Sequence, residues 1–177
     1  MITLINSKKD ELLEHFLVNP TKESHLRELS RNTNISLPWI RKNAEELSKK
    51  GLVSSTSKHG LVIIKANRDN ETYKALKKSY NLFVLYSSGL VEKLVKTYTR
   101  PAIILFGSYS RAEDIEDSDI DIAVITKSHI DIDLSSFEKK LSRKIKILEL
   151  RHDKIEKEFF NTLANGIVLH GYLEVRR

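Results

Sequence analysis

The spacing of apolar side chains in the first part of the chain predicts three short helices. In residues 7–19, 24–32 and 36–49, apolar residues return every three or four positions, which places them on one face of a helix. Ser36 suits the N-cap of the third helix. The expected core positions are Leu12, Leu13, Phe16, Leu17, Leu26, Leu29, Leu37, Ile40, Ala44 and Leu47.

After Gly51 the pattern changes to two apolar, β-branched segments, residues 52–56 and 61–65, joined by a polar turn. Three helices followed by a hairpin resemble a winged helix-turn-helix domain, and the likeness covers about residues 7–66. It implies that the third helix enters a major groove of DNA and that the hairpin forms the wing. The residues expected to contact DNA are then Ser36, Trp39, Arg41, Lys42, Lys58 and His59.

The charge of this part of the chain favours DNA binding over the alternatives. Residues 1–100 carry 18 Lys and Arg against 10 Asp and Glu, and Arg41 and Lys42 lie opposite the apolar stripe of their helix. A protein-interaction or purely structural role also fits the pattern, and in that case Trp39 packs against a neighbour. The basic excess tips the choice toward nucleic acid and leaves the other roles open.

Residues 69–99 form a predicted helical connector. Their apolar positions fit one long helix or two helices joined near Ser87-Ser88-Gly89. The stripe either packs on the second domain or forms the seam of a homodimer, and core packing is the commoner outcome. Its members are Tyr73, Leu76, Tyr80, Phe83, Leu90, Leu94 and Tyr98.

The candidate chemistry lies in residues 102–124. An apolar run of strand length leads directly into Gly107-Ser108, where a glycine lets a phosphate approach the backbone. In the next predicted strand, alternation places Asp119 and Asp121 on one face. Two carboxylates so close together need a cation, and Mg²⁺ prefers oxygen ligands. The pattern therefore predicts a magnesium and phosphate site.

The segment GSYSRAEDIEDSDIDIAV, residues 107–124, resembles the signature of the DNA polymerase β-type nucleotidyltransferase superfamily. Its minimal, single-domain members are the most similar, and the likeness covers about residues 100–173. It implies a small mixed sheet, Mg²⁺ with two ions possible, and transfer of a nucleoside monophosphate from ATP or another NTP. Minimal relatives often act with a separate helical partner of the toxin type.

The same resemblance implies roles for individual residues. Nucleotide binding is expected from Gly107, Ser108, Arg111 and Ser118. It also implies a third carboxylate on a neighbouring strand, which would bind metal and could act as a general base. The expected catalytic and metal-binding residues are then Asp119, Asp121 and Glu149.

Two positions depart from the pattern of the superfamily. Glu149 stands where aspartate is commoner, and the alternative is a surface position on an edge strand. Ala112 stands where relatives commonly have glycine. Alanine tolerates a helix, so we expect this departure to matter only if position 112 needs a positive φ or a close phosphate.

Composition excludes several other classes of protein. There is no cysteine, so disulfides, thiolate zinc sites and cysteine nucleophiles are ruled out. No apolar run approaches the ~18 residues of a membrane span, and the N-terminus lacks the apolar stretch of a signal peptide, which predicts a cytoplasmic protein. Residues 101–177 carry 12 basic and 14 acidic side chains, in contrast to the basic first part.

The expected fold is α+β, with a winged helix-turn-helix domain in residues 1–68, a connector in 69–99 and a nucleotidyltransferase sheet in 100–177. The expected function is magnesium-dependent nucleotidyl transfer to a protein or nucleic-acid acceptor by an enzyme that also binds DNA. The alternative is a DNA-binding transcriptional regulator whose nucleotidyltransferase domain binds nucleotide with little or no turnover.

Overall fold

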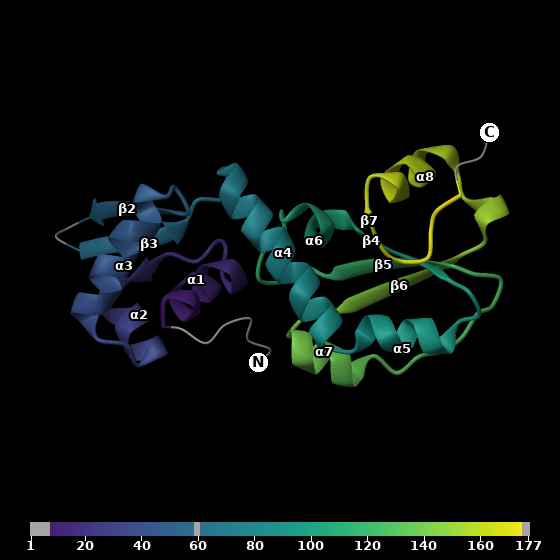
Figure 1. The fold of residues 1–177 in the computed structure, drawn as a ribbon, viewed down its shortest axis with the longest axis horizontal. Coiled ribbons are helices and arrows are strands. Elements are labelled where there is room, and N and C mark those ends of the chain that lie inside the picture. The colour runs from purple at the N-terminus through teal and green to yellow at the C-terminus, as the bar shows by residue number, and fades with distance from the viewer. Residues whose placement is uncertain (1–7, 59–60, 175–177) are drawn as a thin grey trace. The chain divides into compact units, whose positions relative to one another are not determined.

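The computed structural model describes residues 8–58 and 61–174, which fall into two compact units (Figure 1). The N-terminal unit ends at Tyr80 and the C-terminal unit begins at Asn81, so the boundary lies inside α4 (Glu71–Ser87). The predicted connector is therefore divided between the two units. None of the helices in the described part of the chain has the length and apolar character needed to cross a membrane.

The N-terminal unit contains helices and a small antiparallel sheet, with strand order β1-β3-β2. The three predicted helices and the hairpin are present, but the second helix begins later than expected. Ser24 and His25 form a short strand that pairs with Ile64 and Ile63 of β3, and a strand of two residues has no periodicity to detect in a sequence. The elements are α1 (Lys8–Val18), β1 (Ser24–His25), α2 (Leu26–Thr33), α3 (Leu37–Lys49), β2 (Val53–Lys58) and β3 (Leu61–Ala66).

The first part of α4 packs on this unit through two tyrosines. The buried hydroxyl of Tyr73 donates to the backbone oxygen of Phe16 at 2.9 Å, and that of Tyr80 donates to Glu14 Oε1 at 2.9 Å. Burial raises the pKa of Glu14. Most of the apolar stripe of the predicted connector is thus buried within one unit or the other, including Tyr73, Tyr80, Leu90, Leu94 and Tyr98. A homodimer through this segment stays a prediction.

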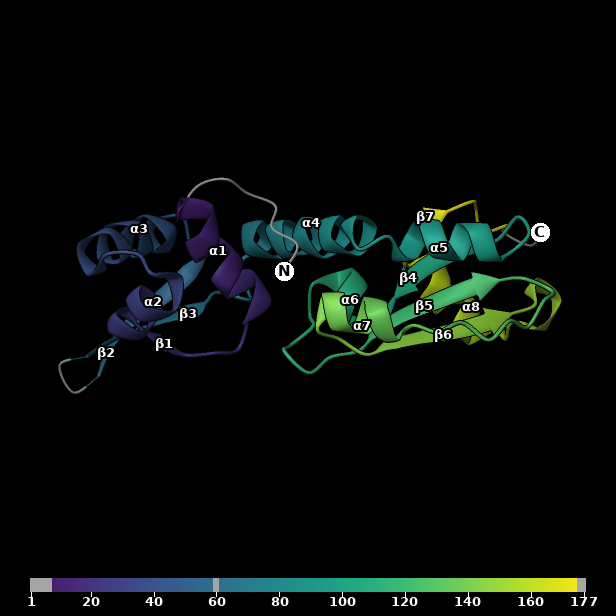
Figure 2. The ribbon, with the colours of Figure 1, turned by 90° about the horizontal axis from the view of Figure 1, so that it is seen from below.

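The C-terminal unit is built on a mixed four-stranded sheet of order β6-β5-β4-β7, as expected. β4 is antiparallel to β5 and β7, while β5 and β6 run side by side in the same direction (Figures 1 and 2). The elements are α5 (Leu90–Thr97), β4 (Ala102–Phe106), α6 (Gly107–Arg111), β5 (Ile120–Ile125), α7 (Ser135–Leu141), β6 (Ile145–Leu150), a short 3₁₀ helix (His152–Lys154), α8 (Lys157–Ala164) and β7 (Ile167–His170).

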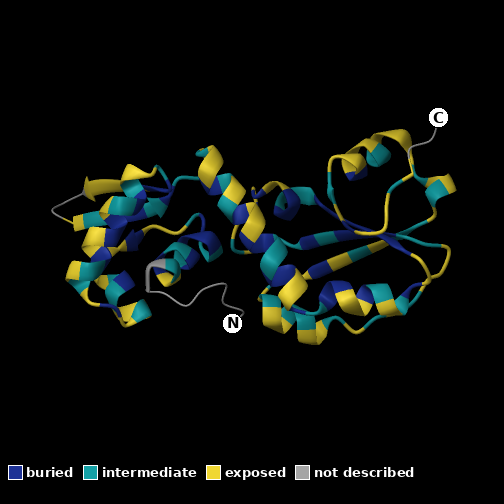
Figure 3. Cartoon of the chain, in the orientation of Figure 1, coloured by how far each residue is buried: buried dark blue, intermediate teal, exposed yellow. Residues whose placement is uncertain are grey.

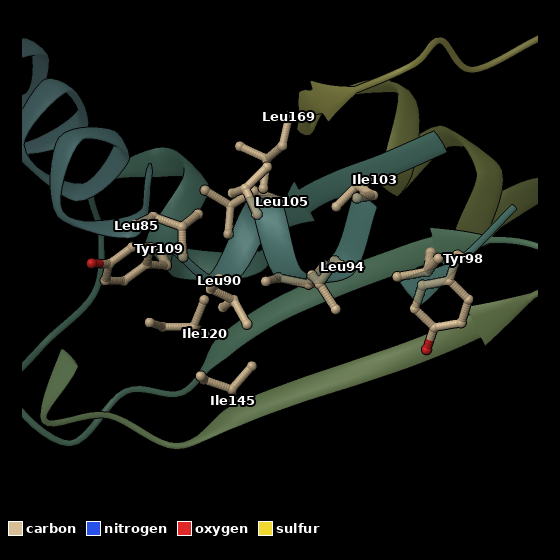
Figure 4. Close-up of a cluster of buried hydrophobic side chains, with 13 residues drawn as sticks. Leu85, Leu90, Leu94, Tyr98, Ile103, Leu105, Tyr109, Ile120, Ile145 and Leu169 are labelled. Atoms are coloured by element: carbon tan, nitrogen blue, oxygen red, sulfur yellow. The ribbon is translucent and has the colours of Figure 1, made fainter. Parts of the chain in front are cut away.

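The central strand β4 is buried along its whole length (Figure 3), because both faces of the sheet are covered there. On one face, a cluster of buried side chains joins the sheet to α5 (Figure 4). Phe137 and Leu141 of α7 pack at the margin of this cluster. On the other face, Leu163 of α8 packs with Ile104, Phe106 and Ala123. Alternation along β5 places Asp121 on the same face as Ala123, the face that α8 partly covers.

Candidate functional site

Gly107 and Asp121 meet at the end of β4. Phe106, the last residue of β4, pairs with Asp121 of β5, and Gly107 follows with a φ of +73°. A Cβ on Gly107 would lie 2.4 Å from Asp121 Oδ2. Glycine is therefore required both by the left-handed backbone and by the carboxylate against its Cα. The sequence explained this glycine only by the approach of a phosphate. The close Asp121 carboxylate is a second reason for glycine here, and the sequence alone did not reveal it.

The helix that begins at Gly107, α6, is about one turn long and ends at a strained position. Ser108 is half-buried within it, and exposed Arg111 pairs with Glu113 through Nε and Oε2 at 2.7 Å. Ala112 then adopts a φ of +60° and a ψ of 30°. This left-handed conformation costs an L-residue roughly 1–2 kcal/mol, and glycine avoids that cost. Position 112 therefore has the positive φ at which glycine would be favoured, and the alanine found there bears the backbone cost.

Asp119 and Asp121 share one face, and a lysine stands beside them. Lys146 on β6 pairs in register with Asp121, and its Nζ lies 2.6 Å from Asp119 Oδ2. The hydrogen bond to Asp119, with the charges of both aspartates, raises the pKa of Lys146. Sequence reasoning missed this residue, because the register between β5 and β6 follows from tertiary packing.

The prediction that Glu149 joins the two aspartates was wrong. Glu149 pairs with Val124, three residues beyond Asp121, so its side chain points to the opposite face of the sheet. There its carboxylate accepts hydrogen bonds from the Tyr98 hydroxyl and, at 2.8 Å, from the Ile130 N–H, and it contacts His129. Burial opposes ionisation, but these hydrogen bonds hold the pKa of Glu149 below its usual value.

The metal-binding capacity of the site thus rests on two carboxylates. Within residues 8–58 and 61–174, no group of three or more His, Cys, Asp or Glu side chains is placed to hold a metal ion. Mg²⁺ commonly uses one or two carboxylates and completes its coordination with water and substrate phosphates. Asp119 and Asp121 fit one such ion. The second ion that the resemblance implies stays a prediction.

A buried polar network holds the loop between α6 and β5. Asp114 is fully buried, and its carboxylate accepts hydrogen bonds from Asn81 Nδ2 at 2.8 Å and from Arg143 at 3.2 Å. Arg143 also donates to the backbone oxygen of Ser118 at 3.1 Å, directly before Asp119. The Ser118 hydroxyl accepts from the Ile115 N–H at 2.9 Å. Of these residues, only Ser118 was singled out from the sequence.

The residues expected to contact DNA are only partly described. Ser36 occupies the N-cap position of α3, although its hydroxyl makes no capping hydrogen bond. Ser36, Arg41 and Lys42 are exposed, and Trp39 is half-buried. For Lys58, which ends β2, only the backbone is described, and His59 lies outside the described residues.

Comparison with known proteins assigns the class of the C-terminal unit. Residues 90–172, from α5 to β7, match the family described as Polymerase beta, Nucleotidyltransferase. These residues form a polymerase β-type nucleotidyltransferase domain, and the match includes Gly107, Asp119 and Asp121. No curated protein matches the chain.

Proposed function

We propose that the C-terminal unit binds a nucleoside triphosphate with one Mg²⁺ and transfers a nucleoside monophosphate to a protein or nucleic-acid acceptor. ATP is the expected donor. The observation that carries the proposal is the placement of Asp119 and Asp121 on one face, with Asp121 against Gly107, within a domain of the nucleotidyltransferase class. Oxygen ligands at the end of a buried strand suit a magnesium–nucleotide complex.

Each residue of the site has a defined part in this proposal. Asp119 and Asp121 would hold the ion, which supplies neutralisation of the charge on the reacting phosphate. Gly107 leaves space for the Asp121 carboxylate. Ser108, in the same turn, would contact a phosphate, and Arg111 would do so after leaving its exposed pair with Glu113.

Removal of the metal tests this proposal. The full-length protein is incubated with cell extract and ATP labelled at the α-phosphate, and label in acid-insoluble protein and nucleic acid is measured. We expect transfer with Mg²⁺, none with EDTA, and recovery when Mg²⁺ is added back, because the divalent ion would supply the neutralisation of charge that the reacting phosphate needs. Transfer that survives EDTA, or no transfer from any of the four NTPs, would contradict the proposal.

We further propose that the N-terminal unit is a winged helix-turn-helix domain that binds DNA. Three helices followed by a hairpin, the order on which the resemblance rests, support this proposal, and Arg41 and Lys42 are exposed on α3. Residues 1–100 carry a net charge of +8, from 18 basic and 10 acidic side chains, which attracts a polyanion.

The double change Arg41→Ala and Lys42→Ala should weaken DNA binding about tenfold or more. It should also reduce the number of counterions released on binding by about two, so that the affinity depends less on salt concentration. Binding is measured by fluorescence anisotropy on duplex DNA over a range of salt concentrations. Lys93→Ala with Lys139→Ala removes the same charge from exposed positions on α5 and α7, and it should bind like the wild type. If both double variants lose the same amount of DNA affinity, the loss reflects net charge alone and argues against a contact between α3 and DNA.

A second candidate function is a DNA-binding regulator that senses nucleotide with little or no turnover. It is favoured by Lys146, which stands beside Asp119, and by the placement of Glu149 on the other face of the sheet. ATP that changes DNA affinity without labelling any acceptor supports this candidate. Labelled acceptor supports the enzyme.

A further inference from the structure

The two aspartates of the site already have a cation beside them. Asp119 and Asp121 together carry two negative charges, and the Lys146 ammonium lies 2.6 Å from Asp119 Oδ2. Lys146 is attached to β6 at the position in register with Asp121, so the sheet itself brings this lysine to the pair. The side chain is 64% exposed, so solvent and ligands reach it.

This arrangement changes how a divalent ion meets the site. An ion that binds alone must share Asp119 with the ammonium or displace it, and like charges at contact distance repel. A nucleotide that arrives with its ion brings phosphate oxygens. Like a carboxylate, a phosphate accepts strong hydrogen bonds from an ammonium. The phosphate can therefore bind Lys146 while the ion binds Asp119.

We propose that Lys146 is a displaceable counter-ion that couples metal binding to nucleotide binding. Without nucleotide it pairs with Asp119 and weakens the affinity for a divalent ion. With nucleotide it moves to a phosphate and strengthens the affinity for the triphosphate. The inference rests on the proposed function of the site. It adds that metal and nucleotide bind cooperatively, each raising the affinity of the protein for the other.

The variant Lys146→Met tests the proposal because it keeps most of the length of the side chain and removes the charge. Free Mn²⁺ is measured by electron paramagnetic resonance during titration of the full-length protein, and ATP binding in EDTA is measured by calorimetry. We expect the variant to bind Mn²⁺ alone about tenfold more tightly than the wild type and ATP without metal about tenfold more weakly. Lys146→Arg keeps the positive charge and should resemble the wild type in both measurements.

Lys96→Met provides a matched control. Lys96 is similarly exposed and pairs with Glu92 on α5, which covers the face of the sheet opposite the two aspartates, so its removal should leave both affinities unchanged. Because Lys146 is mostly exposed, its replacement should also leave the thermal unfolding of the protein unchanged.

The outcomes separate the inference from the function on which it rests. If ATP binds but Lys146→Met leaves the Mn²⁺ affinity within about twofold of the wild type, Lys146 is not the counter-ion, since loss of a charge in contact should exceed that change. If the wild-type protein binds ATP neither with nor without Mn²⁺, the proposed nucleotide site itself is wrong.

Discussion

Replacing Asp114 with alanine should lower the free energy of unfolding of the C-terminal unit by about 3–5 kcal/mol. Asp114 is fully buried and pairs with Arg143, whose side chain is only 9% exposed. The change would leave a guanidinium without its charge partner in a site that water barely reaches. It would also leave Asn81 without the carboxylate that accepts its amide hydrogen bond.

Hydrogen exchange is the measurement best suited to this change, because the only tryptophan, Trp39, reports on the N-terminal unit. Exchange of the β5 amides should accelerate in the Asp114→Ala variant, while exchange in α3 should not. The surface pair of Arg151 and Asp153, whose side chains are 50% and 62% exposed, supplies the control. Asp153→Ala should leave the exchange of the β5 amides as it is in the wild type.

The network around Asp114 also matters for the site, because Arg143 binds the backbone directly before Asp119. The double variant Asp114→Ala with Arg143→Met removes both charges and should recover part of the lost stability. A loss below about 1 kcal/mol in the single variant would mean that the loop is held by other contacts.

The second large effect is expected from Asp119→Asn with Asp121→Asn, which should reduce nucleotidyl transfer by about 10³-fold or more. The amide keeps the shape of each side chain and removes the charges that hold a divalent ion, whose contribution to transition-state stabilisation is several kcal/mol. Initial rates of label transfer with saturating Mg²⁺ and ATP provide the measurement.

Asp117→Asn is the matched control, because Asp117 is exposed in the same loop and is not part of the proposed site. It should transfer label at the wild-type rate. The double variant should remain folded, since its contact with Lys146 is an exposed pair that contributes little stability. Transfer within about tenfold of the wild type would show that the two aspartates do not hold an essential ion.

The sequence was most informative where the deciding pattern is local. Helical spacing located α1, α3 and α5, a continuous apolar run located β4, and alternation of apolar and polar residues located β5. The parity that places Asp119 and Asp121 on one face is a property of a single strand, so it needs no knowledge of neighbours. The succession of a buried strand, Gly107 and the two aspartates was therefore readable directly, and the family match supports its interpretation.

The partners of these residues were decided only by the tertiary structure. The register of β6 against β5 places Lys146 beside Asp121 and turns Glu149 to the opposite face, and a shift of one residue would reverse both. That register depends on packing across the whole sheet, which no short sequence pattern contains. The same is true of Asp114, whose partners Asn81 and Arg143 lie 33 and 29 residues away along the chain. Local alternation thus determined the two aspartates, whereas long-range packing determined the charges that surround them.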